Sequence, residues 1–137
     1  MNIYNILSEV SLFTCENDYN PVDIVVTHGG ALVLSGHRDE TRDIDLWVSR
    51  DIWVNEIKKG GKPKSLGNGV WMISISRNID IHIGWDKPEE DLRETWSGCR
   101  FLSERTLLKE YKKLNRNKDR KTIRMLEDII NVKYNLV

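Results

Sequence analysis

Residues 22–48 read VDIVVTHGGALVLSGHRDETRDIDLWV, and the patterns in this segment predict the centre of the fold. The β-branched run at 22–26 is typical of a buried strand, and Gly29-Gly30 predicts a tight turn after it. Residues 31–34 continue as a short helix that stops near Gly36. Residues 43–48 then alternate acidic and apolar side chains, which is the period of a half-buried strand. We therefore expect a strand, a turn, a short helix and a second strand.

Further elements are predicted on both sides of this segment. Apolar residues at helical spacing predict a helix over 3–13, and a helix over 51–59 could be capped by Asp51. Residues 60–69 contain four glycines and predict a flexible loop. Residues 70–76 and 79–85 predict two strands that pair as a hairpin around Arg77-Asn78.

The chain after Pro88 has a helical pattern. Ser103 is a candidate N-cap, and two helices are expected, separated by a turn at 115–118. The length of 137 residues is sufficient for one domain, with a core at about 22–85 and C-terminal helices at about 90–133. The predicted fold class is α/β (α+β), with a small mixed β-sheet, flanking helices and a C-terminal helical pair.

The charge is balanced overall but unevenly distributed. Twenty-one Lys and Arg residues match twenty-one Asp and Glu residues, which argues against a strongly basic nucleic-acid binder. From Arg100 onward, however, eleven basic residues face five acidic ones, so the first 99 residues carry ten against sixteen. The basic C-terminal third is interpreted either as a solvated helical surface or as a surface that contacts an RNA backbone.

The cysteines and the hydropathy pattern favour a cytoplasmic protein. Cys15 and Cys99 are far apart and lack the spacing of a zinc or redox motif, so reduced thiols are the simpler interpretation. No segment has the length and apolar content of a membrane span, and the N-terminus does not resemble a signal peptide. We expect no membrane partner.

Asp43 and Asp45 are the first candidate site residues. On a strand both side chains point to the same face, roughly 6 to 7 Å apart at a rise of about 3.3 Å per residue. Carboxylate oxygens are ligands that Mg²⁺ prefers, and such a pair could hold two Mg²⁺ ions, with Mn²⁺ as a substitute. The alternative is an edge strand with a solvated polar face.

Asp80 is the third candidate, because it lies between Ile79 and Ile81 on an otherwise apolar strand. A carboxylate buried there without a partner would be costly. If this strand lies beside the Asp43/Asp45 strand, Asp80 completes the metal site and can accept the proton of an attacking hydroxyl. The alternative is a surface acid on a hairpin with two exposed faces.

Glycines and arginines near these acids are candidate phosphate ligands. Gly29 and Gly30 would let backbone N–H groups approach an anion, although a purely structural turn explains them as well. Arg38 and Arg42 could neutralise phosphate charge or could pair with acids in their own loop. His28 and His82 lie beside the motif residues and are interpreted as structural or supporting side chains.

Together these residues resemble the polymerase-β-like nucleotidyltransferase superfamily. The matching segments are His28-Gly29-Gly30-Ala31-Leu32, Thr41-Arg42-Asp43-Ile44-Asp45-Leu46 and Ile79-Asp80-Ile81-His82. The run from Gly36 to Asp45 is similar to antibiotic nucleotidyltransferases that modify lincosamides and aminoglycosides, and to the toxin-type enzymes of abortive-infection and toxin–antitoxin systems. Many members of the superfamily have Ser where this chain has Gly30, so Arg38, Arg42 or backbone groups would replace that contact.

The resemblance implies an enzyme that transfers a nucleoside monophosphate from a nucleoside triphosphate, such as ATP, to an acceptor hydroxyl and releases pyrophosphate. Asp43 and Asp45 would ligate both Mg²⁺ ions, and Asp80 would ligate one ion and act as base. The acceptor could be a small molecule, RNA or protein, and a homodimer could enclose it. The rival interpretation is a noncatalytic nucleotide- or partner-binding module, such as an antitoxin-like regulator.

Overall fold

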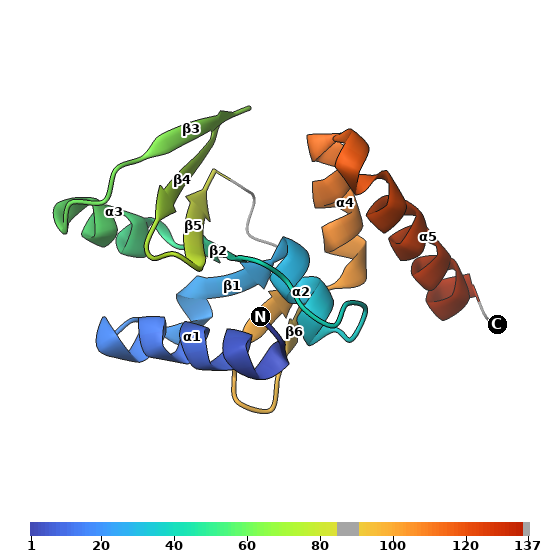
Figure 1. Ribbon diagram of the computed structural model, residues 1–137, viewed down its shortest axis with the longest axis horizontal. Coiled ribbons are helices and arrows are strands. Elements are labelled where there is room, and N and C mark those ends of the chain that lie inside the picture. Colours follow the sequence, from blue (N-terminus) through green and yellow to red (C-terminus); the bar gives the residue numbers. More distant parts are fainter. Residues whose placement is uncertain (85–90, 136–137) are drawn as a thin grey trace.

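The computed structural model describes residues 1–84 and 91–135, and it has an α/β architecture with one seven-stranded mixed sheet (Figure 1). The strand order is β3-β4-β5-β2-β1-β7-β6. The strands are β1 (Ile24–Thr27), β2 (Ile44–Val48), β3 (Lys64–Gly67), β4 (Val70–Ser74), β5 (Ile79–Ile83), β6 (Leu92–Glu94) and β7 (Arg100–Leu102). The helices are α1 (Ile3–Glu16), α2 (His28–Leu34), α3 (Arg50–Lys58), α4 (Glu104–Leu114) and α5 (Arg120–Asn135).

The centre of the sheet follows the predicted order of elements. β1 is antiparallel to β2, and β2 is parallel to β5, so the two strands that carry the candidate acids are neighbours. β4 and β5 form the predicted antiparallel hairpin. The Gly-Gly pair differs slightly from expectation, because it lies inside the first turn of α2 rather than between the strand and the helix.

One hydrophobic core holds the sheet and its helices together. Along β2, Ile44, Leu46 and Val48 are completely buried, whereas Asp45 and Trp47 on the opposite face are half-buried. The buried residues belong to the same core as Ile6 on α1 and Ile52 on α3. The face of β2 that carries Asp45 and Trp47 is therefore the accessible one.

The segments at 60–69 and after 88 differ from the sequence predictions. Residues 64–67 form the edge strand β3 rather than a loop, and residues 92–102 contain the hairpin of β6 and β7 rather than helix. The C-terminal helical pair consequently begins at Glu104, not near residue 90. Such short strands carry little periodicity of their own, and β7 is defined by its parallel pairing with β1, where Phe101 opposes Val26, and by its antiparallel pairing with β6. Pro88, where the helical pattern was expected to begin, lies outside the described residues.

Caps define the helices near the cleft. Ser103 is the N-cap of α4, as predicted, and its hydroxyl accepts a hydrogen bond from the Thr106 N–H. The predicted cap Asp51 is wrong, because Ser49 occupies the N-cap position of α3 and Asp51 lies in the first turn. At the end of α4, Asn115 adopts the left-handed conformation (φ 47°) and turns the chain toward α5.

The C-terminal hairpin lies beside one end of the sheet (Figure 1). α4 and α5 contact each other, and α4 also contacts α2. None of the helices in the described residues is both long enough and apolar enough to cross a lipid bilayer.

Candidate functional site

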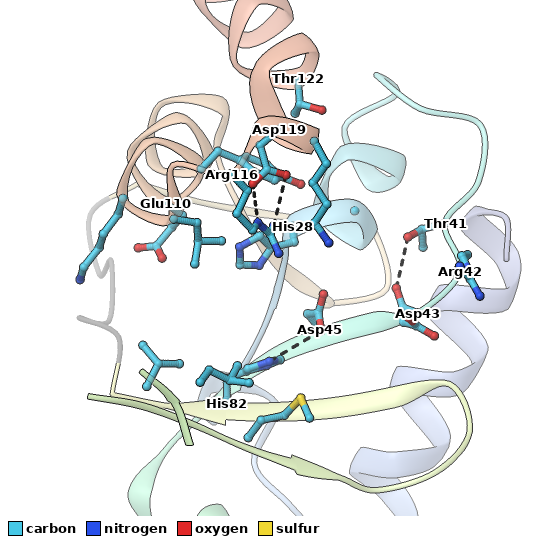
Figure 2. Close-up of a pocket in the computed structure, with 18 of the residues that line it drawn as sticks. His28, Thr41, Arg42, Asp43, Asp45, His82, Glu110, Arg116, Asp119 and Thr122 are labelled. Carbon is cyan, nitrogen blue, oxygen red and sulfur yellow. Dashed lines mark hydrogen bonds and ion pairs between the residues drawn. The ribbon is translucent and has the colours of Figure 1, made fainter. Parts of the chain in front are cut away.

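A cleft of about 820 Å³ opens between the accessible face of the sheet and the α4–α5 hairpin (Figure 2). Its floor includes His28, Asp45 and His82. One wall is the loop that connects α2 to β2, and the other is the end of α4 with the turn that follows it. Polar and charged residues that line these walls are Arg38, Glu40, Thr41, Arg42, Asp43, Glu110, Tyr111, Lys113, Arg116, Lys118, Asp119 and Thr122.

The strand register brings the candidate acids close together. Asp45 on β2 is the Cα partner of Asp80 on the parallel strand β5, and neighbouring residues of this kind point to the same face. Met72 and His82, which also pair in register, both line the cleft. Asp80 lies on the same face of the sheet, one pair further along β5, but it is not among the residues that line the cleft. Asp43 immediately precedes β2 and is exposed at the cleft wall.

Asp80 and Asp45 each lie close to a polar side chain. The Ser74 hydroxyl donates a hydrogen bond of 2.8 Å to Oδ1 of Asp80. Oδ1 of Asp45 lies 3.8 Å from Nε2 of His82 (Figure 2). Within the described residues, no three His, Cys, Asp or Glu side chains are grouped to hold a metal ion. Asp43, Asp45 and Asp80 are thus neighbours, but their side chains do not form a preorganised metal cage.

The electrostatic environment of Asp45 is unusual for an aspartate. The pKa of Asp45 is raised to about 6, mainly by burial and also by the negative charges of Asp80 and Asp43. The positive charges of Arg116 and Lys118 act in the opposite direction. Because an unpaired carboxylate is unstable in such a position, the site favours any ligand that brings positive charge to Asp45.

His28 occupies the turn from β1 into α2. Its backbone is in the left-handed region (φ 51°), which is uncommon for a residue with a Cβ. The ring packs edge-on against Tyr111 of α4, with the centroids 5.1 Å apart. Burial lowers the pKa of His28 to about 3, and nearby His82, Arg116 and Lys118 add to this effect. His28 is therefore uncharged at neutral pH and serves as part of the packed floor.

The two glycines have different surroundings. A Cβ on Gly29 would lie 2.4 Å from the Thr41 hydroxyl and 3.1 Å from a terminal nitrogen of Arg38. A Cβ on Gly30 would instead meet the Val26 side chain of β1 at 2.8 Å. Gly29 lines the cleft and Gly30 does not. Close packing thus requires a small residue at both positions, and only Gly29 is placed to contact a ligand.

Arg38 and Arg42 both reach the cleft, as the sequence suggested. Among the described residues, neither forms an ion pair with Asp39 or Glu40, the pairing considered as an alternative. Their loop is anchored where Thr41 donates its backbone N–H to the Met1 carbonyl and its hydroxyl to the Asp43 carbonyl. The arginines are therefore available on the cleft wall.

The loop is also attached to the base of α4. The Glu104 carboxylate is buried. Its Oε1 lies 3.1 Å from Nε2 of His37, and its Oε2 lies 3.2 Å from a terminal nitrogen of Arg93 on β6. His37 immediately precedes Arg38, so this link connects the loop that carries Arg38 to the start of α4. The residues that form it are distant in sequence, and no spacing in the sequence pointed to the contact.

The contribution of the α4–α5 turn was also missed by sequence reasoning. Arg116, Lys118 and Asp119 line the cleft, and Lys113 reaches it from the end of α4. The basic excess after Arg100 was interpreted as a solvated or RNA-binding surface, whereas three of its members face this cleft. An acid three residues after Arg116 was the available signal, because such spacing permits an ion pair within one turn.

No family model, curated protein or solved structure matches the chain. The function must therefore be inferred from the residues of the cleft and their order in the sequence.

Proposed function

We propose that the protein is a metal-dependent nucleotidyltransferase that moves a nucleoside monophosphate from a nucleoside triphosphate to an acceptor hydroxyl. The observation that carries this proposal is the in-register pairing of Asp45 and Asp80 on parallel strands. Asp43 lies two residues before Asp45 and immediately precedes the same strand. Three carboxylates from two distant parts of the sequence thus lie near one another, beside a cleft lined by both basic and acidic residues.

The donor chemistry supports Mg²⁺ or Mn²⁺ as the cofactor. Asp43, Asp45 and Asp80 would supply hard oxygen ligands, and Mg²⁺ in proteins is commonly held by one or two carboxylates together with substrate phosphates. Because no three such side chains are grouped among the described residues, phosphate oxygens of the triphosphate would have to complete the metal site. When bound, the metal would activate the acceptor hydroxyl and stabilise the departing pyrophosphate. We therefore expect metal binding to depend on the triphosphate.

Asp80 is the proposed base. The Ser74 hydroxyl occupies only Oδ1 of Asp80, and this hydrogen bond holds the carboxylate in place on β5. A fixed carboxylate beside the Asp45 strand can accept the proton of the acceptor hydroxyl as the new phosphate ester forms. Asp45 and Asp43 would hold the metal at the same time.

The basic and glycine residues of the loop side support triphosphate binding. Gly29 lets Thr41 and Arg38 pack closely against the start of α2, and Arg38 and Arg42 bring positive charge to the same wall. A guanidinium offers a planar set of donors that matches phosphate oxygens. These residues would take the place of the Ser contact that the superfamily often has at the position of Gly30.

The test is a transfer assay with each labelled triphosphate, Mg²⁺ or Mn²⁺, and small-molecule, RNA and protein acceptors. We expect transfer in the wild type and its loss in Asp45→Asn and Asp80→Asn. Asp51→Asn, a matched change of an exposed acid in α3, should retain wild-type activity. Triphosphate binding without transfer to any acceptor would instead support the noncatalytic binding module, and full activity of Asp80→Asn would remove Asp80 from the site.

A further inference from the structure

We propose that Arg116, held in place by Asp119, binds the phosphate chain of the nucleotide from the α4–α5 side of the cleft. This inference rests on the proposed function and adds a binding group that the sequence motif does not contain. Its ligand class is a linear polyphosphate, whether it is part of a nucleoside triphosphate or is the pyrophosphate released from it.

The Arg116–Asp119 pair is a two-point contact. Nε of Arg116 donates to Oδ2 of Asp119 over 2.6 Å, and a terminal nitrogen donates to Oδ1 over 3.2 Å. The Asp119 side chain is only 7% exposed, whereas the Arg116 side chain is 41% exposed. One edge of the guanidinium is therefore fixed against a buried carboxylate, and its remaining N–H groups are accessible.

The accessible part of Arg116 belongs to the cleft. Figure 2 shows the Arg116–Asp119 pair above His28, on the side of the cleft opposite Arg42 and Thr41. Arg116 and Lys118 are close enough to Asp45 to act on its pKa, and they act on that of His28 as well. Two basic side chains of the α4–α5 turn thus line the same cleft as Arg38 and Arg42 of the α2–β2 loop and the carboxylate of Asp45.

This arrangement favours a phosphate chain over an uncharged ligand. A polyphosphate carries several negative charges along its length and can contact cations from both walls at once. Asp119 balances the charge of Arg116 but occupies only one edge of its guanidinium, and Lys118 forms no ion pair among the described residues. A ligand with one isolated charge would use only one of these walls.

Asp119 is a positioning residue in this scheme. Without its carboxylate the Arg116 side chain would sample several rotamers, so part of the binding free energy would be spent on ordering it. Asp119→Asn keeps the size of the side chain but removes the charge that orients the guanidinium. We therefore expect Asp119→Asn to weaken polyphosphate binding less than Arg116→Ala does.

The experiment is calorimetric titration of the protein with sodium tripolyphosphate in the presence of Mg²⁺, a measurement that needs no acceptor and no turnover. Arg116→Ala should raise the Kd about 10- to 100-fold, as expected for the loss of a charge-assisted hydrogen bond. Arg116→Lys should recover only part of the affinity, because an ammonium lacks the planar fork. Arg120→Ala removes an exposed arginine that does not line the cleft and should leave the Kd unchanged. Melting temperatures establish whether each variant is folded. If Arg116→Ala does not fold, the Kd of Arg116→Lys is compared with that of the wild type instead.

The outcomes separate this inference from the proposed reaction. An equal Kd for wild type and Arg116→Ala, or no tripolyphosphate binding by the wild type, would overturn the role of Arg116. If the protein transfers no nucleotide but binds tripolyphosphate in a way that depends on Arg116, the polyphosphate site is supported and the proposed transferase activity is contradicted. Transfer activity that is unaffected in Arg116→Ala, with unchanged KM for the triphosphate, would count against Arg116 and not against the reaction.

Discussion

At the scale of single residues, Asp45 shows most clearly how the environment shapes the candidate site. It is half-buried next to Asp43 and Asp80, and burial is the main reason that its pKa is raised to about 6 from the usual 3.8. Since the folded protein binds this proton more tightly than the unfolded chain, the ionised carboxylate destabilises the fold above pH 6. The penalty disappears as the pH falls below about 4, where both states are protonated.

Asp45→Asn should therefore stabilise the metal-free protein at high pH. We expect a gain of about 2 kcal/mol in the free energy of unfolding at pH 8, after allowance for the 29% exposure of the side chain. The gain should be close to zero at pH 4. Urea denaturation at both pH values in the presence of a chelator measures this, with Asp51→Asn as the control. A loss of stability at pH 8 would show that the carboxylate is satisfied in the folded protein.

Gly29 is a second residue whose surroundings lead to a prediction. Gly29→Ala places a Cβ 2.4 Å from the Thr41 hydroxyl, so the loop that carries Arg38 and Arg42 must shift. We expect a loss of about 1 to 3 kcal/mol of stability and weaker triphosphate binding. Thr41→Ala removes the clashing oxygen, so Gly29→Ala should cost much less in that background. An equal cost in both backgrounds, measured by denaturation, would show that the clash is not with Thr41.

At the scale of elements, the α4–α5 turn determines which basic residues reach the cleft. Asn115 ends α4 in the left-handed conformation, and Arg116, Lys118 and Asp119 follow within one turn. The turn is thus a short, sharply bent connection that points part of a basic hairpin toward the floor of the sheet. A change in its backbone should alter both the stability of the hairpin and the position of Arg116.

Asn115→Ala and Asn115→Gly should differ in their effect on the free energy of unfolding. Alanine is sterically strained at φ 47°, so we expect Asn115→Ala to lower the free energy of unfolding by about 1 kcal/mol. Glycine adopts this conformation freely and is the commonest residue at such helix ends, so Asn115→Gly should be neutral or slightly stabilising. Thermal denaturation of the two variants measures this difference. Equal destabilisation would indicate that the Asn115 side chain itself contributes to stability.

At the scale of the whole molecule, the cleft is assembled from parts that are far apart in the chain. The floor comes from β2, β5 and the start of α2, one wall comes from the loop before β2, and the other comes from the C-terminal hairpin. Glu104 connects the start of α4 to the loop before β2 through His37 and to β6 through Arg93. A ligand that contacts both walls and the floor should consequently stabilise the entire fold.

We expect a nucleoside triphosphate with Mg²⁺ to raise the melting temperature, because ligand at 100 times its Kd adds about 2.7 kcal/mol to the native state. Mg²⁺ alone should have little effect, since the phosphates are needed to complete the metal site. Asp45→Asn should remove the Mg²⁺-dependent part of the shift. Differential scanning calorimetry with each component separately checks this, and an equal shift with Mg²⁺ alone would mean that the protein holds the metal by itself.

Local sequence patterns were sufficient to predict the elements at the centre of the fold and the start of α4. The period-two pattern at 43–48, the hairpin around Arg77-Asn78 and the cap at Ser103 all depend on neighbours within a few residues, and the structure confirms them. The α/β class followed from the same patterns. The candidate acids were also identifiable, because a carboxylate among apolar strand residues is unusual wherever the strand lies.

The contacts between these residues depend on the tertiary structure. Short strands such as β3, at the edge of the sheet, and β7, between β1 and β6, are defined by their partners, so their own residues carry no sufficient signal. The neighbourhood of Asp45 and Asp80 depends on β5 pairing beside β2, and the turn after α4 reaches the cleft because of the way the hairpin packs. Strand pairing and helix docking join residues that are distant in the chain, and their free energy comes from contacts that no local pattern records.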